Sequence, residues 1–79
     1  MSEAKYKEAF LEGLAIDDDI KIEKLKFNDI EEWDSIGHMG LMSALEEAFN
    51  ISIETDDIVD FSSYEKGIEI LSKYDVIIK

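Results

Sequence analysis

Apolar side chains recur at helical spacing in two long segments of the chain, residues 3–14 and 35–49. A first helix over residues 3–14, with Ser2 as its N-cap, carries three apolar residues on one face: Tyr6, Phe10 and Leu14. A second helix starts at Ser35 and has apolar residues three and four apart, namely Ile36, Met39, Met42, Leu45 and Phe49, flanked by Leu41 and Ala48. Asn50 is a suitable stop for this helix. The pattern therefore predicts two amphipathic helices.

Two further helices are predicted nearer the C-terminus, the first of them short. One begins at Thr55 and ends near Phe61, with Asp56 and Asp57 in the first turn, where negative charge complements the helix dipole. The other begins with the capping-box pattern Ser62-Ser-Tyr-Glu65. It places four apolar residues on one face: Tyr64, Ile68, Leu71 and Tyr74. The apolar tail 76–78 is too short for its pattern to select a conformation.

The stretch between Leu14 and Ser35 fits no helix. Ile20 and Ile22 alternate with charged residues as in a strand, but a lone strand needs a partner, and the only other alternation is the short segment 51–53. We therefore expect a connection of about twenty residues. Apolar residues at intervals would hold it against the core: Ile16, Ile20, Ile22, Leu25, Phe27, Ile30 and Trp33. The predicted fold class is all-α, a small four-helix bundle of three main helices and one short helix with a long first loop.

Length and composition agree with one small folded domain over residues 1–79. The chain has no cysteine, hence no disulfide and no cysteine metal site. It shows no signal-peptide pattern and no apolar run long enough to span a bilayer, so we expect a cytoplasmic protein without membrane contact. A hydrophobic content of 46% can supply a core, which makes disorder unfavourable.

The net charge of −12 indicates which partners the chain can bind. Every basic residue is lysine, and none lies between Phe27 and Glu65, where acidic residues are frequent. Such a region repels phosphate backbones, so we expect no nucleic-acid partner. It attracts basic protein surfaces and speeds association with them. Acidity that serves solubility alone explains the same composition.

Ser35 has the most informative position in the chain. It lies at the predicted start of the second helix, directly after Asp34, where free N–H groups and the positive end of the helix dipole suit a phosphate ester. The simpler role for a serine here is that of N-cap, and the two roles are compatible. His38 has no serine–histidine–acid arrangement around it and is expected at the surface as a docking residue. Without a nucleophile–base pair, we expect no enzyme.

Asp34-Ser35-Ile36 resembles the Asp-Ser-Leu attachment motif of the acyl carrier and peptidyl carrier protein family. Residues 44–49, followed by 51–53, are similar to that family's helix end and the apolar turn after it, and the order of helices also agrees. Trp33 before the motif and Gly37-His38-Met39 after it are closer to carriers of specialised pathways than to those of bulk fatty-acid synthesis.

The resemblance implies that Ser35 carries 4′-phosphopantetheine, transferred from coenzyme A by a phosphopantetheinyl transferase. Asp34 would help to hold the magnesium ion of that enzyme. The thiol of the arm would carry an acyl or aminoacyl group as a thioester for the enzymes of a specialised biosynthetic pathway. Other implied partners are an acyl- or aminoacyl-loading ligase and acyltransferases with basic docking patches, and the chain is expected to be a monomer. Four residues are candidates for meeting these partners: Ile36, Met39, Glu46 and Glu47.

The resemblance also implies an interior that admits an acyl chain. The candidate lining is Met39, Leu45, Phe49 and Ile53, although packing in the core explains the same residues. Glu46 and Glu47 are equally explained as a solvated face. No metal site of the chain's own is expected, because Asp17-Asp18-Asp19 fails the calcium-loop spacing, with Ile22 and Asn28 where that loop needs glycine and glutamate.

Gly37 and Gly40 depart from the fatty-acid carriers, which usually have acidic residues at these places. Each glycine costs a helix interior roughly 1 kcal/mol relative to alanine. The hypothesis is that they leave a bare strip of backbone beside Ser35, which lets a partner or the arm approach closely. The rival to the carrier function is an unmodified acidic helical module that acts through protein–protein contact alone.

Mutual repulsion among the acidic side chains predicts a stability that depends on salt. We expect the melting temperature near neutral pH to rise with moderate salt, or with divalent ions that Asp56, Asp57 and Asp60 would bind weakly. Thermal melts followed by circular dichroism at fixed pH measure this. Melting temperatures that respond to neither addition would contradict the account.

Overall fold

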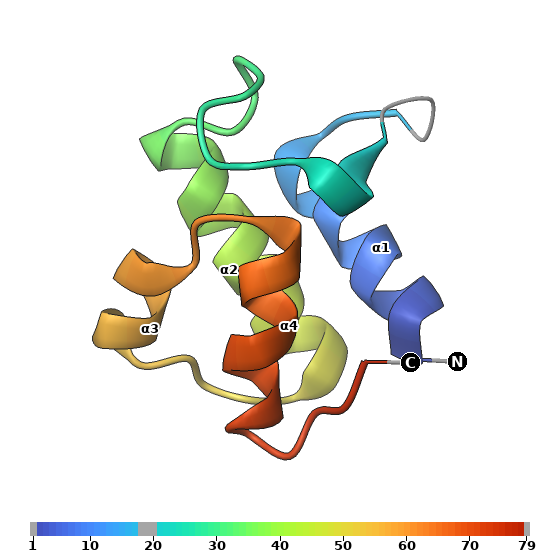
Figure 1. Ribbon diagram of the computed structural model, residues 1–79, viewed down its shortest axis with the longest axis vertical. Helices are drawn as coiled ribbons and strands as arrows, with labels where there is room; N and C mark the ends of the chain where they lie inside the picture. The colour runs from blue at the N-terminus through green and yellow to red at the C-terminus, as the bar shows by residue number, and fades with distance from the viewer. Residues whose placement is uncertain (1, 18–20, 79) are drawn as a thin grey trace.

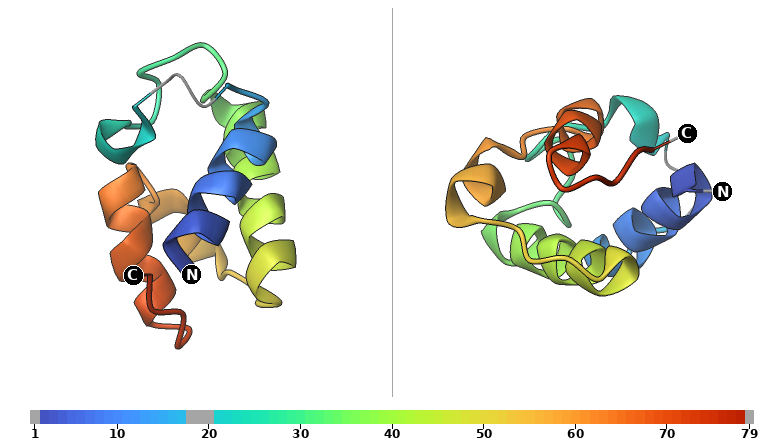
Figure 2. Two further views of the ribbon diagram at one scale, coloured as in Figure 1. Left: turned by 90° about the vertical axis from the view of Figure 1, so that its right-hand side faces the viewer. Right: turned by 90° about the horizontal axis from the view of Figure 1, so that it is seen from below.

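The computed structural model describes residues 2–17 and 21–78. The α-helices in these ranges are α1 (Ser2–Leu14), α2 (Ser35–Phe49), α3 (Thr55–Asp60) and α4 (Tyr64–Ser72). A 3-10 turn, η1 (Ile22–Lys24), lies in the first connection, and the described residues form no strand. The three long helices and α3 surround a common interior (Figures 1 and 2). The predicted all-α bundle with a long first loop is confirmed.

None of these helices is both long enough and apolar enough to pass through a bilayer, in the part of the chain that the structure describes. α1 and α2 lie against each other in antiparallel directions (Figure 1), and α4 lies on the other side of the interior from α2 (Figure 2). Residues 21–34, the part of the first connection that leads into α2, pass over one end of the bundle, so α2 starts at that end (Figure 1).

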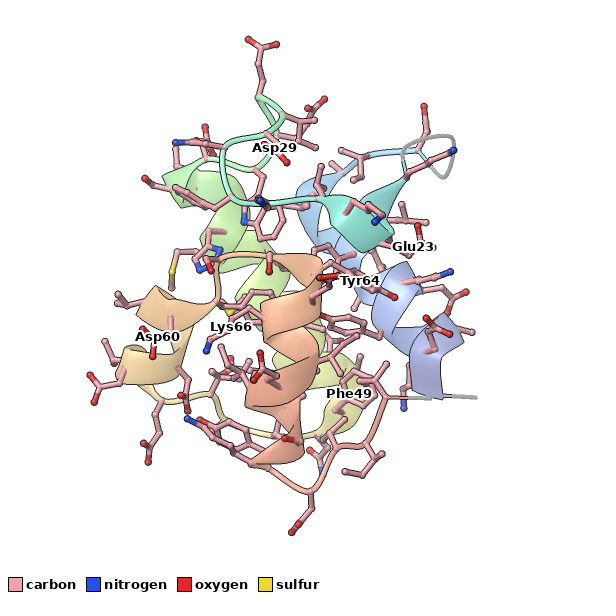
Figure 3. The ribbon with its side chains drawn as sticks, viewed as in Figure 1. Glu23, Asp29, Phe49, Asp60, Tyr64 and Lys66 are labelled. Atoms are coloured by element: carbon pink, nitrogen blue, oxygen red, sulfur yellow. The ribbon has the colours of Figure 1, made fainter. Side chains whose placement is uncertain are left out.

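The core is built around aromatic rings from every part of the chain. Phe10 of α1 is at its centre, with ring centroids 5.4 Å from Trp33, 5.2 Å from Tyr64 and 6.0 Å from Phe61. Such pairs contribute about 0.5–1.5 kcal/mol each beyond the burial of their area. Tyr64 is the first residue of α4, and its ring packs against Phe10 of α1 (Figure 3). The predicted inner face of the first helix is confirmed, since all three of its residues are buried: Tyr6, Phe10 and Leu14.

The inward face of α2 differs from the predicted stripe. Its buried residues are His38, Leu41, Met42 and Leu45. Ile36 is 83% exposed and Met39 is 55% exposed. Ile36 and Leu45 are nine residues apart, which is about two and a half helical turns, so they face opposite sides of the helix. The two apolar residues at the start of α2 therefore lie on the surface.

The long connection is held to the core through three of the residues predicted for this purpose. Ile22, Leu25 and Trp33 are buried, whereas Phe27 is 37% exposed. Ile16 and Ile30 are partly buried against the core. Ile20 lies outside the described residues. The prediction that the connection is anchored at intervals is confirmed for its middle and its end.

Backbone pairing fixes the same connection to the turn before α4. The N–H of Phe27 donates to the carbonyl of Ser62 at 2.8 Å, and the N–H of Tyr64 donates to the carbonyl of Leu25 at 3.0 Å. Because Ser62 takes part in this pairing, the N-cap of α4 is Ser63, whose Oγ accepts the N–H of Lys66 at 3.0 Å. The predicted capping box starting at Ser62 is therefore wrong: the N-cap is one residue later, and the residue three positions after it is Lys66, which cannot complete a box.

The inward face of α4 is also rotated relative to the prediction. Its buried residues are Tyr64, Gly67, Ile70 and Leu71. Ile68 and Tyr74, both predicted to lie on the buried face, are only partly buried. In contrast, the short helix predicted to start at Thr55 is confirmed as α3.

A polar cluster joins α3 to the end of α4. Asp57 is 6% exposed, and its carboxylate accepts hydrogen bonds from Lys73 Nζ and from the Tyr74 hydroxyl, both at 2.5 Å. The Tyr74 hydroxyl also accepts the N–H of Glu54 at 3.0 Å. The hydrogen bond from Lys73, followed by that from Tyr74, holds the pKa of Asp57 below its usual value. Asp57 is therefore committed to the fold and is not free for the weak cation binding predicted for it.

We expect Asp57→Asn to lower the melting temperature at neutral pH by more than Asp56→Asn, the matched control at an exposed position of the same helix. The reason is that the neutral amide loses the charge that Lys73 and Tyr74 stabilise. Thermal melts of both variants and of the wild type measure this. Equal melting temperatures for the two variants would contradict the structural role of Asp57.

The same cluster predicts a pH dependence. Since the folded-state pKa of Asp57 lies below the value of about 3.9 in an unfolded chain, the stability it contributes is complete above that value. It is lost as the pH falls through the lower, folded-state pKa. The difference in unfolding free energy between wild type and Asp57→Asn, measured by urea denaturation, should therefore be constant near neutrality and shrink below about pH 4.

Candidate functional site

The predicted site lies where the long connection enters α2, at the upper end of the bundle in Figure 1. Ser35 is the first residue of α2 and is exposed, as are Asp34 and Ile36 on either side of it. The site is therefore open to a protein that approaches from solvent.

Asp34, and not Ser35, caps α2. Its backbone is extended, with φ −103° and ψ −167°, and its Oδ1 accepts the N–H of Gly37 at 2.8 Å. The interpretation of Ser35 as N-cap is therefore wrong, and its hydroxyl is not used for this bond. Helix geometry leaves the N–H groups of Ser35 and Ile36 without an intrahelical acceptor. Together with the helix dipole, they make this end of α2 suitable for an anionic group.

Gly37 and Gly40 serve close packing inside the chain. A Cβ at position 37 would lie 1.8 Å from the carbonyl oxygen of Glu32, so Gly37 lets the connection turn tightly into α2. A Cβ at position 40 would lie 2.9 Å from the carbonyl oxygen of Gly13, so Gly40 lets α1 and α2 approach each other. Both glycines therefore have an explanation in packing within the chain, whereas the predicted role of a bare strip beside Ser35 stays a hypothesis, since Gly40 is exposed.

His38 is buried, with 9% exposure, one helical turn behind Ser35. Its Nδ1 accepts the indole N–H of Trp33 at 2.9 Å, and its Nε2 lies 2.7 Å from the carbonyl oxygen of Ile58. An indole nitrogen can only donate and a carbonyl can only accept, so these partners select the neutral ring with its hydrogen on Nε2. The predicted surface position of His38 is wrong. The spacing to Leu41 and Leu45 on the buried face is the signal that would have placed it correctly.

Exposed apolar side chains surround the start of α2. Ile36 and Met39, two of the predicted partner-binding residues, are exposed, and so is Val59 of α3, at 76%, which sequence reasoning missed. The bond between His38 and Ile58 brings their two helices into contact, so Met39 and Val59 belong to adjoining segments. These side chains contribute little to the core and are available to a partner.

The two acidic residues predicted to meet partners have different environments. Glu46 is half-buried, and its Oε2 accepts the N–H of Ile53 at 2.8 Å, which holds the turn after α2. Glu47 is exposed. Glu46 is therefore committed to the fold, and Glu47 is the acidic residue of this pair that faces solvent.

The residues predicted to line an acyl interior do not form one group. Leu45 and Ile53 are packed in the core, with 0% and 6% exposure. Phe49 is half-buried at the far end of α2, where Lys5 Nζ lies 5.4 Å from its ring centroid (Figure 3). Met39 is at the surface, so its prediction as part of an interior lining is wrong.

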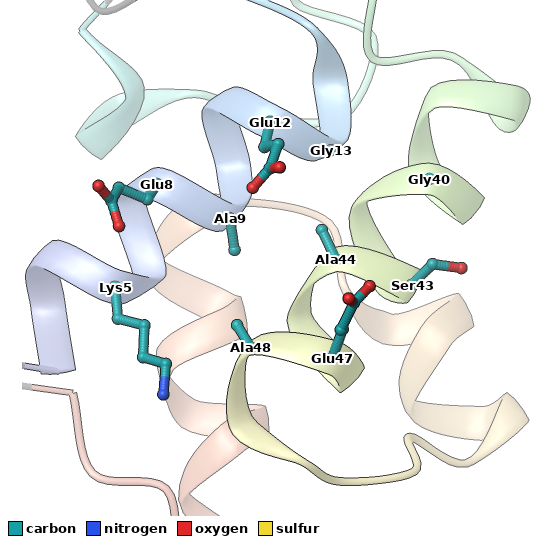
Figure 4. Close-up of a pocket in the computed structure, with 10 residues that line it drawn as sticks. All are labelled: Lys5, Glu8, Ala9, Glu12, Gly13, Gly40, Ser43, Ala44, Glu47 and Ala48. Atoms are coloured by element: carbon teal, nitrogen blue, oxygen red, sulfur yellow. The ribbon is translucent and has the colours of Figure 1, made fainter.

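A groove of about 680 Å³ lies instead between α1 and α2. Small residues from both helices face each other across it, with carboxylates along its margins (Figure 4). Of the predicted site residues, only Glu47 lines this groove. Within the described ranges, no three carboxylate or imidazole side chains are grouped so that they could hold a metal ion.

The close contact at Gly37 predicts an unusual response to alanine. Gly→Ala inside a helix normally stabilises by about 1 kcal/mol. At position 37 we expect a loss of about 1–3 kcal/mol in unfolding free energy, because the added Cβ overlaps the carbonyl of Glu32. Urea denaturation measures this, with Ser43→Gly, an exposed change in the same helix, as a check on ordinary helix propensity. A more stable Gly37→Ala chain would contradict the contact.

No protein-family model, curated protein or solved structure matches this chain. What the start of α2 does must therefore be inferred from its own residues. They are an exposed serine at the first helical position, an aspartate that already makes the capping bond, and exposed apolar side chains beside them.

Proposed function

We propose that the protein is a non-catalytic carrier, which holds acyl or aminoacyl intermediates as thioesters on a 4′-phosphopantetheine arm attached to Ser35. The observation that carries this proposal is the exposed position of Ser35 at the first residue of α2, with its hydroxyl left free because Asp34 makes the capping bond. The arm supplies the reactive thiol that a chain without cysteine lacks. The cargo is delivered to enzymes of a specialised biosynthetic pathway.

The helix start suits the attached phosphodiester. As the Ser35 Oγ–phosphorus bond forms, the phosphoanhydride bond of coenzyme A breaks, the hydroxyl proton leaves and the nucleotide half departs. The resulting anion is adjacent to the N–H groups of the first helical turn and to the positive end of the dipole of a 15-residue helix.

Asp34 has a further role in this proposal. One carboxylate oxygen is used by the N–H of Gly37, and a carboxylate has a second oxygen with which to accept or ligate. Magnesium prefers such hard oxygen ligands. Asp34 therefore contributes to holding the magnesium ion of the phosphopantetheinyl transferase while Ser35 is loaded.

The surface around Ser35 supports docking of basic partner enzymes. Ile36, Met39 and Val59 are apolar and exposed, and the chain between Phe27 and Glu65 contains no lysine. Interfaces commonly combine an apolar centre with a charged rim, and opposite charges steer the encounter. The partners are the transferase, an acyl- or aminoacyl-loading ligase and acyltransferases, each with a basic patch.

Intact mass tests the attachment. Purified chain is incubated with coenzyme A, magnesium and a promiscuous phosphopantetheinyl transferase. We expect one phosphopantetheinyl increment on the wild type and on Ser43→Ala, the matched control at an exposed serine of the same helix. We expect none on Ser35→Ala, whose fold is checked by circular dichroism.

The other outcomes are equally informative. An unmodified wild type would overturn the carrier and favour the unmodified acidic interaction module. An increment that persists in Ser35→Ala would place the attachment on another residue and would overturn the assignment of Ser35.

A further inference from the structure

We propose that His38 is a proton-sensitive latch, which fixes the start of α2, and with it Ser35, to α3 and to the preceding connection. The latch is closed in the neutral ring, with Trp33 bonded to Nδ1 and Ile58 bonded to Nε2. A proton added at Nδ1 opens it. The latch stands on this geometry alone, while its bearing on the loading of Ser35 rests on the proposed carrier function.

The two hydrogen bonds are compatible with only one protonation state. The ring is 9% exposed, and its nitrogens lie 2.9 Å from the indole nitrogen of Trp33 and 2.7 Å from the carbonyl oxygen of Ile58. In an imidazolium both nitrogens donate, so Nδ1–H would face the indole N–H. Trp33 is fully buried, and a buried donor that loses its acceptor is costly. Protonation therefore breaks the contact between His38 and Trp33.

Aromatic rings enclose His38 and exclude water from it. The His38 ring centroid lies 5.4 Å from that of Phe27, 6.0 Å from that of Phe61 and 6.2 Å from that of Trp33, whose ring is within 18° of parallel. These ring contacts hold the imidazole in the orientation in which both of its hydrogen bonds form. The closed latch and the neutral ring thus stabilise each other.

Charged residues lie on the elements that pack against the latch. Those nearest in sequence on the packed elements are Lys26, Asp29, Glu31, Glu32, Asp34, Asp57 and Asp60. The Asp29 carboxylate accepts the N–H of Lys26, that of Asp34 accepts the N–H of Gly37, and that of Asp57 is paired with Lys73. Both ring nitrogens already have partners, so the protonation state of the closed latch is set by the two hydrogen bonds to Trp33 and Ile58.

Opening the latch affects the mobility of Ser35 through the connection that precedes α2. Residues 28–33 form a closed loop, in which the N–H of Asn28 donates to the carbonyl of Trp33 at 3.0 Å and the N–H of Trp33 donates to that of Ile30 at 3.1 Å. Trp33 anchors this loop in the core and is two residues before Ser35. When the indole loses His38, the loop loses its polar anchor, and the first turn of α2 becomes more mobile at acidic than at neutral pH.

The test follows the indole N–H of Trp33, the only tryptophan, by NMR in the full chain carrying Ser35→Ala, which cannot be loaded at that residue. We expect its resonance to move, and its open population measured by hydrogen exchange to rise by up to about tenfold per pH unit, as the pH falls through the range where histidine takes up a proton. Exchange at the backbone amides of residues 34–38 should rise in step, relative to residues 41–45.

The matched variant is His38→Gln, whose amide keeps one acceptor and one donor but takes up no proton in this range. In this variant the indole signal should not depend on pH. The same pH dependence in both chains would assign the effect to the carboxylates and overturn the latch. An indole signal that does not depend on pH in the chain with His38 would also overturn it.

A second measurement covers the case in which His38→Gln does not fold. The ring nitrogen shifts of His38 report its tautomer directly in the chain with His38. Hydrogen on Nε2 at neutral pH, followed by protonation that coincides with loss of indole protection, supports the latch. A protonated ring beside a fully protected indole would overturn it. If the chain gains no phosphopantetheinyl mass but the latch responds to pH as described, only the carrier proposal is overturned. If the chain gains that mass but the latch does not respond to pH, only the latch is overturned.

Discussion

A buried indole N–H must find an acceptor inside the protein, and this requirement organises the structure. Trp33 is fully buried, and His38 Nδ1 is its acceptor. The same ring donates to the carbonyl of Ile58, so one side chain joins the long connection, α2 and α3. A chain of 79 residues buries only a modest core. Between Lys24 and Ser35 the connection has no regular helix, so its position depends on individual side-chain contacts such as this one. The contact of Trp33 with Phe10 then attaches this junction to α1.

Local periodicity was sufficient to predict the helices, because the spacing of Tyr6, Phe10 and Leu14 and the start of α3 depend on neighbouring residues alone. Features that depend on contacts distant in sequence were not predictable. The cap of α4 moved from Ser62 to Ser63 because of pairing with the connection. Gly37 is explained by a nearby residue, the carbonyl of Glu32, but Glu32 lies in an irregular loop whose path no periodicity reveals. The exposure of Ser35 agrees with the predicted site. The burial of His38 was not predicted, because its polar side chain suggests a surface position, whereas its helical spacing to Leu41 and Leu45 places it on the buried face.

The few lysines strengthen the acidic character of the remaining surface. Lys7 pairs with Glu23 at 2.6 Å, Lys73 with Asp57, and Lys5 lies over the ring of Phe49. These positive charges are held against particular partners of the same chain, on α1 and after α4, and none lies on α2 or α3. The lysine-free part of the sequence between Phe27 and Glu65 includes Ser35 and is rich in acidic side chains, so a basic partner would be attracted to this part of the chain.

At the start of α2 the backbone is held in place by contacts within the chain, whereas several side chains are exposed and make few such contacts. Asp34 and Gly37 hold the first turn through the capping bond and the close contact with Glu32, yet Ile36 beside them is 83% exposed and would lose little packing if it were polar. Single exposed apolar residues are ordinary on protein surfaces, but here Ile36, Met39 and Val59 are all on segments that meet at His38. Ser35 and His38 are three residues apart, so the exposed hydroxyl and the buried ring belong to the same turn of α2. A change of charge on the ring therefore acts on the same turn that presents the hydroxyl, so the packing that anchors the site is also the means by which its mobility can be altered.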